Sequence, residues 1–125
     1  MTTILFCEDD VVIQRLIQVA TRSLPYTVHV VGDGAQGLAT IERERPAAVF
    51  TDLAMPGFDG LQLIDALHAR PDLADVPVVV MTASGLLASD LEDLLRRGAV
   101  DYLAKPFGPA ELRAKLDQVL APLGT

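Results

Sequence analysis

The chain has 125 residues, of which 50% are hydrophobic and 22% are charged. This length fits one folded domain, which we take to span residues 1–125, and the composition excludes a disordered or low-complexity chain. Ten basic residues stand against 17 acidic residues, which gives a net charge of −7. Because so acidic a surface repels nucleic-acid phosphates and anionic lipids, we expect no direct binding to nucleic acid or to membranes.

A single cysteine, Cys7, rules out an internal disulfide, as is usual in a reducing compartment. The longest apolar runs are far too short to cross a bilayer, and the first residues lack the basic and apolar segments of a signal peptide. We therefore expect a cytoplasmic protein.

In the first part of the chain, short apolar runs alternate with helical patterns. Thr3–Cys7 and Thr27–Val31 predict strands. Between them, apolar residues recur at helical spacing from Ile13 to Leu24, and Pro25 ends this pattern. A weaker helical pattern covers about residues 35–45.

The same alternation continues through the middle of the chain. Strands are expected at Ala47–Thr51, which stops at Asp52, and at Val78–Met81, which is rich in β-branched residues without polar alternation. Residues 55–60 are dense in turn formers and predict a loop, and the apolar residues from Leu61 to Leu67 mark a third helix.

Two further elements follow towards the end of the chain. Ser89 and Glu92 match a capping box, which predicts a fourth helix that begins after Ser89 and ends at Gly98. A fifth strand is expected at Val100–Leu103, and Pro109 is well suited to open a last helix.

Strands and helices thus alternate along the whole chain. Buried strands that alternate with helices form a parallel sheet covered on both faces, and right-handed crossovers leave few topologies. We therefore predict an α/β fold with a doubly wound, five-stranded parallel sheet.

Polar residues follow four of the predicted strands. Glu8-Asp9-Asp10 follow the first, Asp52 the third, Thr82 the fourth, and Lys105 the fifth. Parallel strands bring their carboxyl ends to one edge of the sheet, where ligands of such sheets bind. The sequence therefore predicts a site that combines carboxylates, a hydroxyl and an ammonium group.

The carboxylates of this site suit a magnesium ion. Clustered carboxylates repel one another, and Mg²⁺, which prefers hard oxygen ligands, offsets that repulsion. We expect Asp10 and Asp52 to bind Mg²⁺ directly, Asp9 to bind it directly or through water, and the backbone carbonyl of Ala54 to add an oxygen. The alternative for residues 8–10 is an acidic helix start that complements the helix dipole.

These residues together resemble the receiver domains of two-component response regulators. The resemblance rests on the acidic pair, on the segment from Asp52 to Gly60, on Thr82-Ala83 and on Lys105-Pro106-Phe107, which occur in order along essentially the whole chain. It implies a flavodoxin-like fold with strand order 2-1-3-4-5, and a regulatory phosphoacceptor domain rather than an enzyme.

The resemblance also implies a role for each site residue. Asp52 would be the phosphoacceptor, a carboxylate nucleophile that takes a phosphoryl group from a histidine kinase or a histidine phosphotransfer protein. Lys105 and Mg²⁺ would neutralise charge during transfer. The Thr82 hydroxyl, assisted by the backbone N–H of Ala83, would bind phosphoryl oxygens.

A conformational switch is a further implication of the resemblance. When Thr82 moves towards the phosphoryl group, Tyr102 would turn inward and change the surface of the fourth helix, fifth strand and fifth helix, which controls a protein partner or output domain. Lys105–Pro106 resembles the structural cis peptide of the family. Dimerisation through this surface is compatible with the sequence but not required by it.

The chain also departs from the family pattern. The stretch from Thr82 to Lys105 is slightly longer than usual, and we place the extra length within residues 85–88. Ala54 and Ser84 occupy positions that tune the lifetime of the phosphoryl group in this family.

Two alternative functions are weighed against this one. A degenerate receiver would act only as an interaction module, although every expected phosphorylation residue is present. A phosphatase with an aspartate nucleophile needs a general acid two residues after Asp52, where Ala54 stands. The sequence leaves open the kinase, the output, and whether the chain stands alone or belongs to a longer regulator or hybrid kinase.

Overall fold

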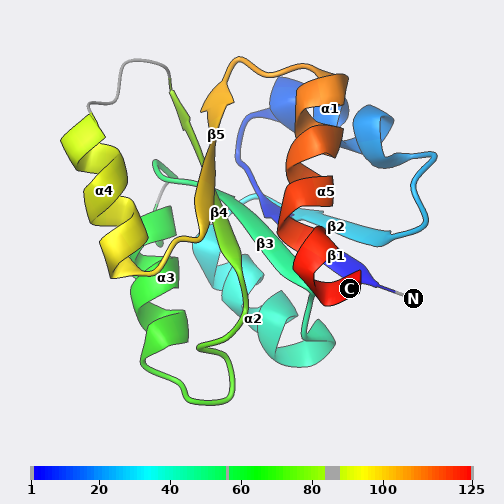
Figure 1. Ribbon diagram of the computed structural model, residues 1–125. Helices are drawn as coiled ribbons and strands as arrows, with labels where there is room; N and C mark the ends of the chain where they lie inside the picture. Colours follow the sequence, from blue (N-terminus) through cyan, green and yellow to red (C-terminus); the bar gives the residue numbers. More distant parts are fainter. Residues whose placement is uncertain (1, 56, 84–87, 125) are drawn as a thin grey trace.

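Five runs rich in apolar residues form one parallel sheet in the computed structural model, which describes residues 2–55, 57–83 and 88–124 (Figure 1). The sheet order is β2-β1-β3-β4-β5, as predicted, and every neighbouring pair is parallel. The strands are β1 (Thr3–Cys7), β2 (Thr27–Val31), β3 (Ala48–Asp52), β4 (Val78–Ala83) and β5 (Asp101–Lys105).

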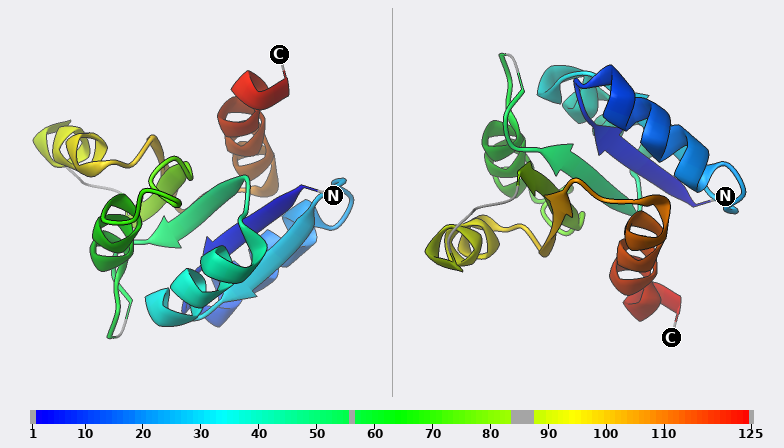
Figure 2. Two further views of the ribbon diagram at one scale, coloured as in Figure 1. Left: turned by 90° about the horizontal axis from the view of Figure 1, so that it is seen from below. Right: turned by 90° about the horizontal axis from the view of Figure 1, so that it is seen from above.

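Helices cover both faces of the sheet. They are α1 (Val11–Thr21), α2 (Gly34–Glu44), α3 (Gly60–His68), α4 (Ala88–Arg97) and α5 (Pro109–Gly124). α1 and α5 pack against each other on one face, and α2, α3 and α4 lie on the other. Figure 2 shows α5 on the opposite side of the sheet from α2 and α3. None of the helices in the described part of the chain has both the length and the apolar composition that a membrane span requires.

Alternate residues of β1, β3 and β4 pack into two separate cores. In β1, Ile4 and Phe6 face α1 and α5, whereas Leu5 and Cys7 face α2 and α3. Phe6 also packs on Phe50 of β3, with ring centroids 4.9 Å apart. A sheet buried on both faces needs apolar side chains at successive positions, which is why the strands lack polar alternation.

Three strands extend beyond the apolar runs that predicted them. β3, β4 and β5 continue to Asp52, Ala83 and Lys105. Backbone pairing does not require an apolar side chain, so Asp52 still lies opposite Met81 in the ladder between β3 and β4. Asp52, Thr82 and Lys105 are therefore held by the sheet itself rather than by loops, whereas Glu8, Asp9 and Asp10 lie between β1 and α1.

The start of α4 differs from the prediction. The helix already includes Ala88, so Ser89 lies inside it and does not cap it. A capping box occurs instead at α3, where the Asp59 carboxylate accepts the Gln62 N–H (2.9 Å) and the Gln62 side chain accepts the Asp59 N–H (2.8 Å). The predicted end of α4 is confirmed, because Gly98 has a φ of 125°, which favours glycine.

Two glycines allow the helices to approach the loop after β3. A Cβ on Gly60 would lie 2.4 Å from the carbonyl oxygen of Asp52, and one on Gly34 would lie 2.3 Å from that of Phe58. The Gly60 N–H donates to the Leu53 carbonyl at 3.1 Å. The absence of a side chain at Gly60 thus lets α3 begin directly against the end of β3.

Replacement of Gly60 by alanine should lower the free energy of unfolding by about 1–3 kcal/mol, because rigid backbone must shift to admit the methyl group. Gly32→Ala is the matched control, since an added Cβ there meets nothing within 4 Å. Its effect should stay within about 0.5 kcal/mol. Urea unfolding followed by circular dichroism measures both variants, and a Gly60→Ala protein as stable as the wild type would contradict the close approach.

Candidate functional site

The carboxyl ends of β1, β3, β4 and β5 meet at one edge of the sheet (Figure 1). Cys7 lies opposite Thr51 between β1 and β3, and Asp52 lies opposite Met81 between β3 and β4. Because the strands end in register, the side chains at and just beyond these positions lie close together.

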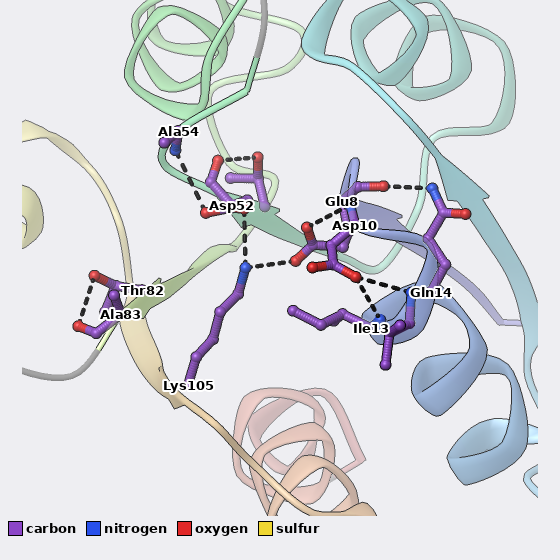
Figure 3. A network of polar contacts seen from close by, with 11 residues as sticks. Glu8, Asp10, Ile13, Gln14, Asp52, Ala54, Thr82, Ala83 and Lys105 are labelled. Atoms are coloured by element: carbon purple, nitrogen blue, oxygen red, sulfur yellow. Dashed lines mark hydrogen bonds and ion pairs between the residues drawn. The ribbon is translucent and has the colours of Figure 1, made fainter.

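The Lys105 ammonium group lies between two carboxylates (Figure 3). Its Nζ atom is 2.9 Å from Oδ2 of Asp52 and 2.6 Å from Oε1 of Glu8. The Lys105 and Asp52 side chains are 17% and 15% exposed, and that of Glu8 is 0% exposed. Water screens these charges less than it screens an ion pair on an open surface.

Strand alternation explains why these three side chains meet. Side chains two positions apart in a strand point to the same face of the sheet. Thr82 stands two positions after Val80, which packs on the face covered by α2 and α3. The other three side chains stand two positions after a core residue of the α1 and α5 face. Glu8 comes two residues after Phe6, Asp52 two after Phe50, and Lys105 two after Leu103.

Glu8 is held by its backbone as well as by its carboxylate. Its N–H donates to the Val31 carbonyl (2.9 Å), and its Oε2 accepts the Asp10 N–H (3.0 Å). Burial raises the pKa of Glu8 above its ordinary value, although the hydrogen bonds from Lys105 and Asp10 oppose this shift. Burial lowers the pKa of Lys105, but the contacts with Glu8 and Asp52 outweigh it and the net shift is upward. Lys105 therefore keeps its positive charge at neutral pH.

Three acidic side chains form a cluster that suits a divalent cation. Carboxylate oxygens of Glu8, Asp9 and Asp52 all lie within 4.8 Å of one another. Mg²⁺ takes hard oxygen ligands of this kind and usually keeps several waters, which the exposed side of the cluster at Asp9 can admit. Ala54 adjoins the cluster, since its backbone N–H lies 3.4 Å from Oδ1 of Asp52.

Asp10 lies outside this cluster, so the expectation that it binds the metal directly does not fit the structure. Its Oδ1 accepts the backbone N–H groups of Val12 (2.8 Å) and Ile13 (3.3 Å), which makes it the N-cap of α1. The helix-start alternative therefore holds for Asp10. Glu8 takes its place beside Asp9 and Asp52.

Thr82 lies at the same edge but makes a different contact. The residue is 6% exposed, and its hydroxyl donates to the Ala83 carbonyl at 3.4 Å (Figure 3). In this structure the hydroxyl is therefore bonded to its own strand rather than to Asp52. Ser84 and residues 85–87, where we placed most of the extra length, lie outside the described residues.

The sequence singled out Tyr102 in β5 and Pro106 directly after it. The Lys105–Pro106 peptide bond is cis, which confirms the expectation for Pro106. Tyr102 is 38% exposed, and its backbone N–H donates to the Asp101 carboxylate at 2.8 Å. Asp101 also pairs with Lys115 of α5 at 2.9 Å. These contacts link the strand that carries Tyr102 to α5.

Two contacts of the site were not predicted from the sequence. The first is the ion pair between Glu8 and Lys105, which strand alternation from Phe6 could have indicated. The second joins the side-chain N–H of Gln14 to the Glu8 carbonyl, with Nε2 and oxygen 2.6 Å apart. A lone glutamine on a helix gives no signal by which this second contact could have been found.

Residues 4–117 match the response regulator receiver domain family. The chain is 36% identical over 120 residues to "Probable transcriptional regulator ycf27" of Porphyridium aerugineum. This alignment covers 94% of this chain and 47% of that protein. It is 34% identical over 116 residues to the DNA-binding response regulator MtrA of Mycobacterium tuberculosis H37Rv. This alignment covers 90% of this chain and 48% of MtrA. The chain thus spans about half the length of these curated relatives.

Solved structures show the same similarity. The receiver domain of the sensor histidine kinase PA1611 from Pseudomonas aeruginosa PAO1 aligns with a TM-score of 0.84 and 37% identity, over 96% of this chain and 98% of that one. That domain has a magnesium ion coordinated in its active site cleft. NtrX from Brucella abortus aligns with a TM-score of 0.83 and 29% identity, over 96% of this chain and 27% of NtrX. With its fold, its acidic cluster and the family match over most of its length, this chain belongs to the response regulator receiver domains of two-component systems.

Proposed function

We propose that the chain accepts a phosphoryl group on Asp52 from a phosphohistidine of a histidine kinase or a histidine phosphotransfer protein. The observation that supports this most directly is the contact between Lys105 Nζ and Asp52 Oδ2, at 2.9 Å, beside the acidic cluster. A carboxylate held at the sheet edge next to a fixed ammonium group is well placed to attack phosphorus, because the cation can bind the incoming negative charge.

In the proposed reaction, an Asp52 carboxylate oxygen forms a bond to phosphorus. The bond from phosphorus to the donor imidazole breaks, and its electron pair stays on the imidazole nitrogen. Asp9, Asp52 and the Ala54 carbonyl would hold a Mg²⁺ ion, and Glu8 would hold it directly or through a bound water. The ion would neutralise charge on the phosphoryl oxygens. Lys105 would bind one phosphoryl oxygen, and so would the Thr82 hydroxyl after it leaves the Ala83 carbonyl.

The same proposal includes a switch in the surface of α4, β5 and α5. Thr82 and Tyr102 belong to neighbouring strands, and both alternate with residues of the opposite core, Met81 and Leu103. They therefore share the face of the sheet covered by α2, α3 and α4. Movement of the Thr82 hydroxyl towards Asp52 would open space into which Tyr102 can turn, and a protein partner, an output domain or a second copy of the domain would bind the altered surface.

Two expectations from composition stay predictions within this proposal. MtrA, of which this chain matches about half, is a DNA-binding response regulator. The net charge of −7 still argues that this domain does not itself contact nucleic acid. Location in the cytoplasm, where histidine kinases present their phosphohistidine, is likewise proposed.

The phosphoacceptor assignment predicts that acetyl phosphate with Mg²⁺ adds one phosphoryl group to the wild type and none to Asp52→Asn, because an amide is a poor nucleophile. Asp59→Asn is the matched control, since it removes another carboxylate of the same loop while asparagine still caps α3. Intact-protein mass spectrometry reads the result. Equal labelling of Asp52→Asn and Asp59→Asn would refute the assignment.

The cation site predicts opposite outcomes for two adjacent acids. Asp9→Ala should weaken Mg²⁺ binding at least roughly tenfold, because it removes a proposed ligand or the anchor of a bound water. Asp10→Ala should leave Mg²⁺ affinity within about twofold but lower stability by about 0.5–2 kcal/mol, because it removes the cap of α1. Calorimetric titration and urea unfolding measure the two effects, and the reverse pattern would restore Asp10 as the ligand. A wild-type protein that neither binds Mg²⁺ nor becomes phosphorylated would favour the degenerate receiver.

A further inference from the structure

Asp9 is an exposed member of the acidic cluster whose direction depends on the peptide groups on either side of it. On its C-terminal side, the N–H of Asp10 donates to Oε2 of Glu8 at 3.0 Å. On its N-terminal side, the carbonyl of Glu8 accepts Nε2 of Gln14 at 2.6 Å (Figure 3). Both peptide planes that flank Asp9 are therefore held by side chains.

The Gln14 contact replaces a backbone partner that the sheet no longer provides. The residue register of β1 with both of its neighbours ends at Cys7, and the Glu8 N–H still donates to the Val31 carbonyl of β2. Within the described residues, the Gln14 amide is the hydrogen-bond donor to the Glu8 carbonyl. The backbone N–H of Gln14 also donates to the Asp10 carbonyl at 2.9 Å. One residue of α1 thus binds a carbonyl on each side of Asp9.

We propose that Gln14 is a positioning residue for the divalent cation site. Its amide holds the peptide between Glu8 and Asp9, and this keeps the Asp9 carboxylate directed at Asp52 without any contact between Gln14 and the cation. The inference rests on the cation site proposed above. Residues that orient metal ligands from outside typically change affinity by a factor of about 10–100 when they are removed.

The test compares Gln14→Met with Gln18→Met in the whole chain. Methionine matches the length of glutamine but donates no hydrogen bond, and Gln18 is an exposed residue one turn further along α1. Proteins labelled with ¹⁵N are titrated with Mg²⁺ and followed by NMR. The dissociation constant should rise roughly tenfold in Gln14→Met and stay unchanged in Gln18→Met. The Asp9 and Asp10 amide signals of Gln14→Met should also shift before any Mg²⁺ is added.

A purely structural role for Gln14 predicts a different result. It would lower the urea midpoint of Gln14→Met but leave the Mg²⁺ dissociation constant of the folded protein unchanged, and that outcome overturns the inference. Gln14→Ala, which keeps a strong helix former, serves as a second variant if methionine impairs folding. Metal-free spectra with unmoved Asp9 and Asp10 signals would also overturn the inference. A wild type that binds no Mg²⁺ would refute the proposed cation site instead.

Discussion

One ammonium group shared by two carboxylates is the interaction on which the rest of the site depends. Lys105 contacts Glu8 and Asp52 together, and Glu8 is fully buried. Without the Lys105 ammonium group, the buried Glu8 carboxylate would lie beside the Asp52 carboxylate without a positive partner. Removal of one partner from a buried ion pair typically costs about 3–5 kcal/mol of stability. The ends of β1, β3 and β5 are therefore interdependent, because each supplies one member of the group.

The strand order decides how far Lys105 must reach. β4 lies between β3 and β5, so the lysine side chain has to cross the end of β4 to contact Asp52. Ala83 lies opposite Lys105 in the ladder and follows Met81, which packs on the α1 and α5 face. A methyl group at this position leaves room for the long lysine side chain. Lysine suits the task because its charge sits at the tip of a flexible four-carbon chain.

Most of the fold could be predicted because its signals are local. β1 and β2 have the predicted bounds, since each apolar run ends where the backbone pairing also ends. β3, β4 and β5 were predicted to end too early, because Asp52, Thr82 and Lys105 are polar but remain in the ladder. A strand end that carries the site looks like a loop when polarity alone marks the boundary.

Within the site, residue types could be predicted more fully than contacts. Three consecutive acids could not show by composition that Asp10 caps α1 while Glu8 and Asp9 face Asp52. That division depends on where the sheet ends and the helix begins, which spacing leaves uncertain by a residue. The Gln14 contact is harder still to predict, because it depends on where the first turn of α1 lies relative to the end of β1.

The two faces of the sheet divide the residues of the proposed site into two groups. Glu8, Asp52 and Lys105 follow residues of the α1 and α5 core, whereas Thr82 and Tyr102 lie on the other face. In the proposed function, a charge added to Asp52 would alter the first group directly and would reach Tyr102 through the end of β4. Thr82 is the residue at that end which carries a hydroxyl, and in this structure the hydroxyl is bonded to the Ala83 carbonyl. In the proposed function, a phosphoryl group must compete with that carbonyl for the Thr82 hydroxyl, so the strength of a single weak hydrogen bond bears on how readily the signal crosses the sheet.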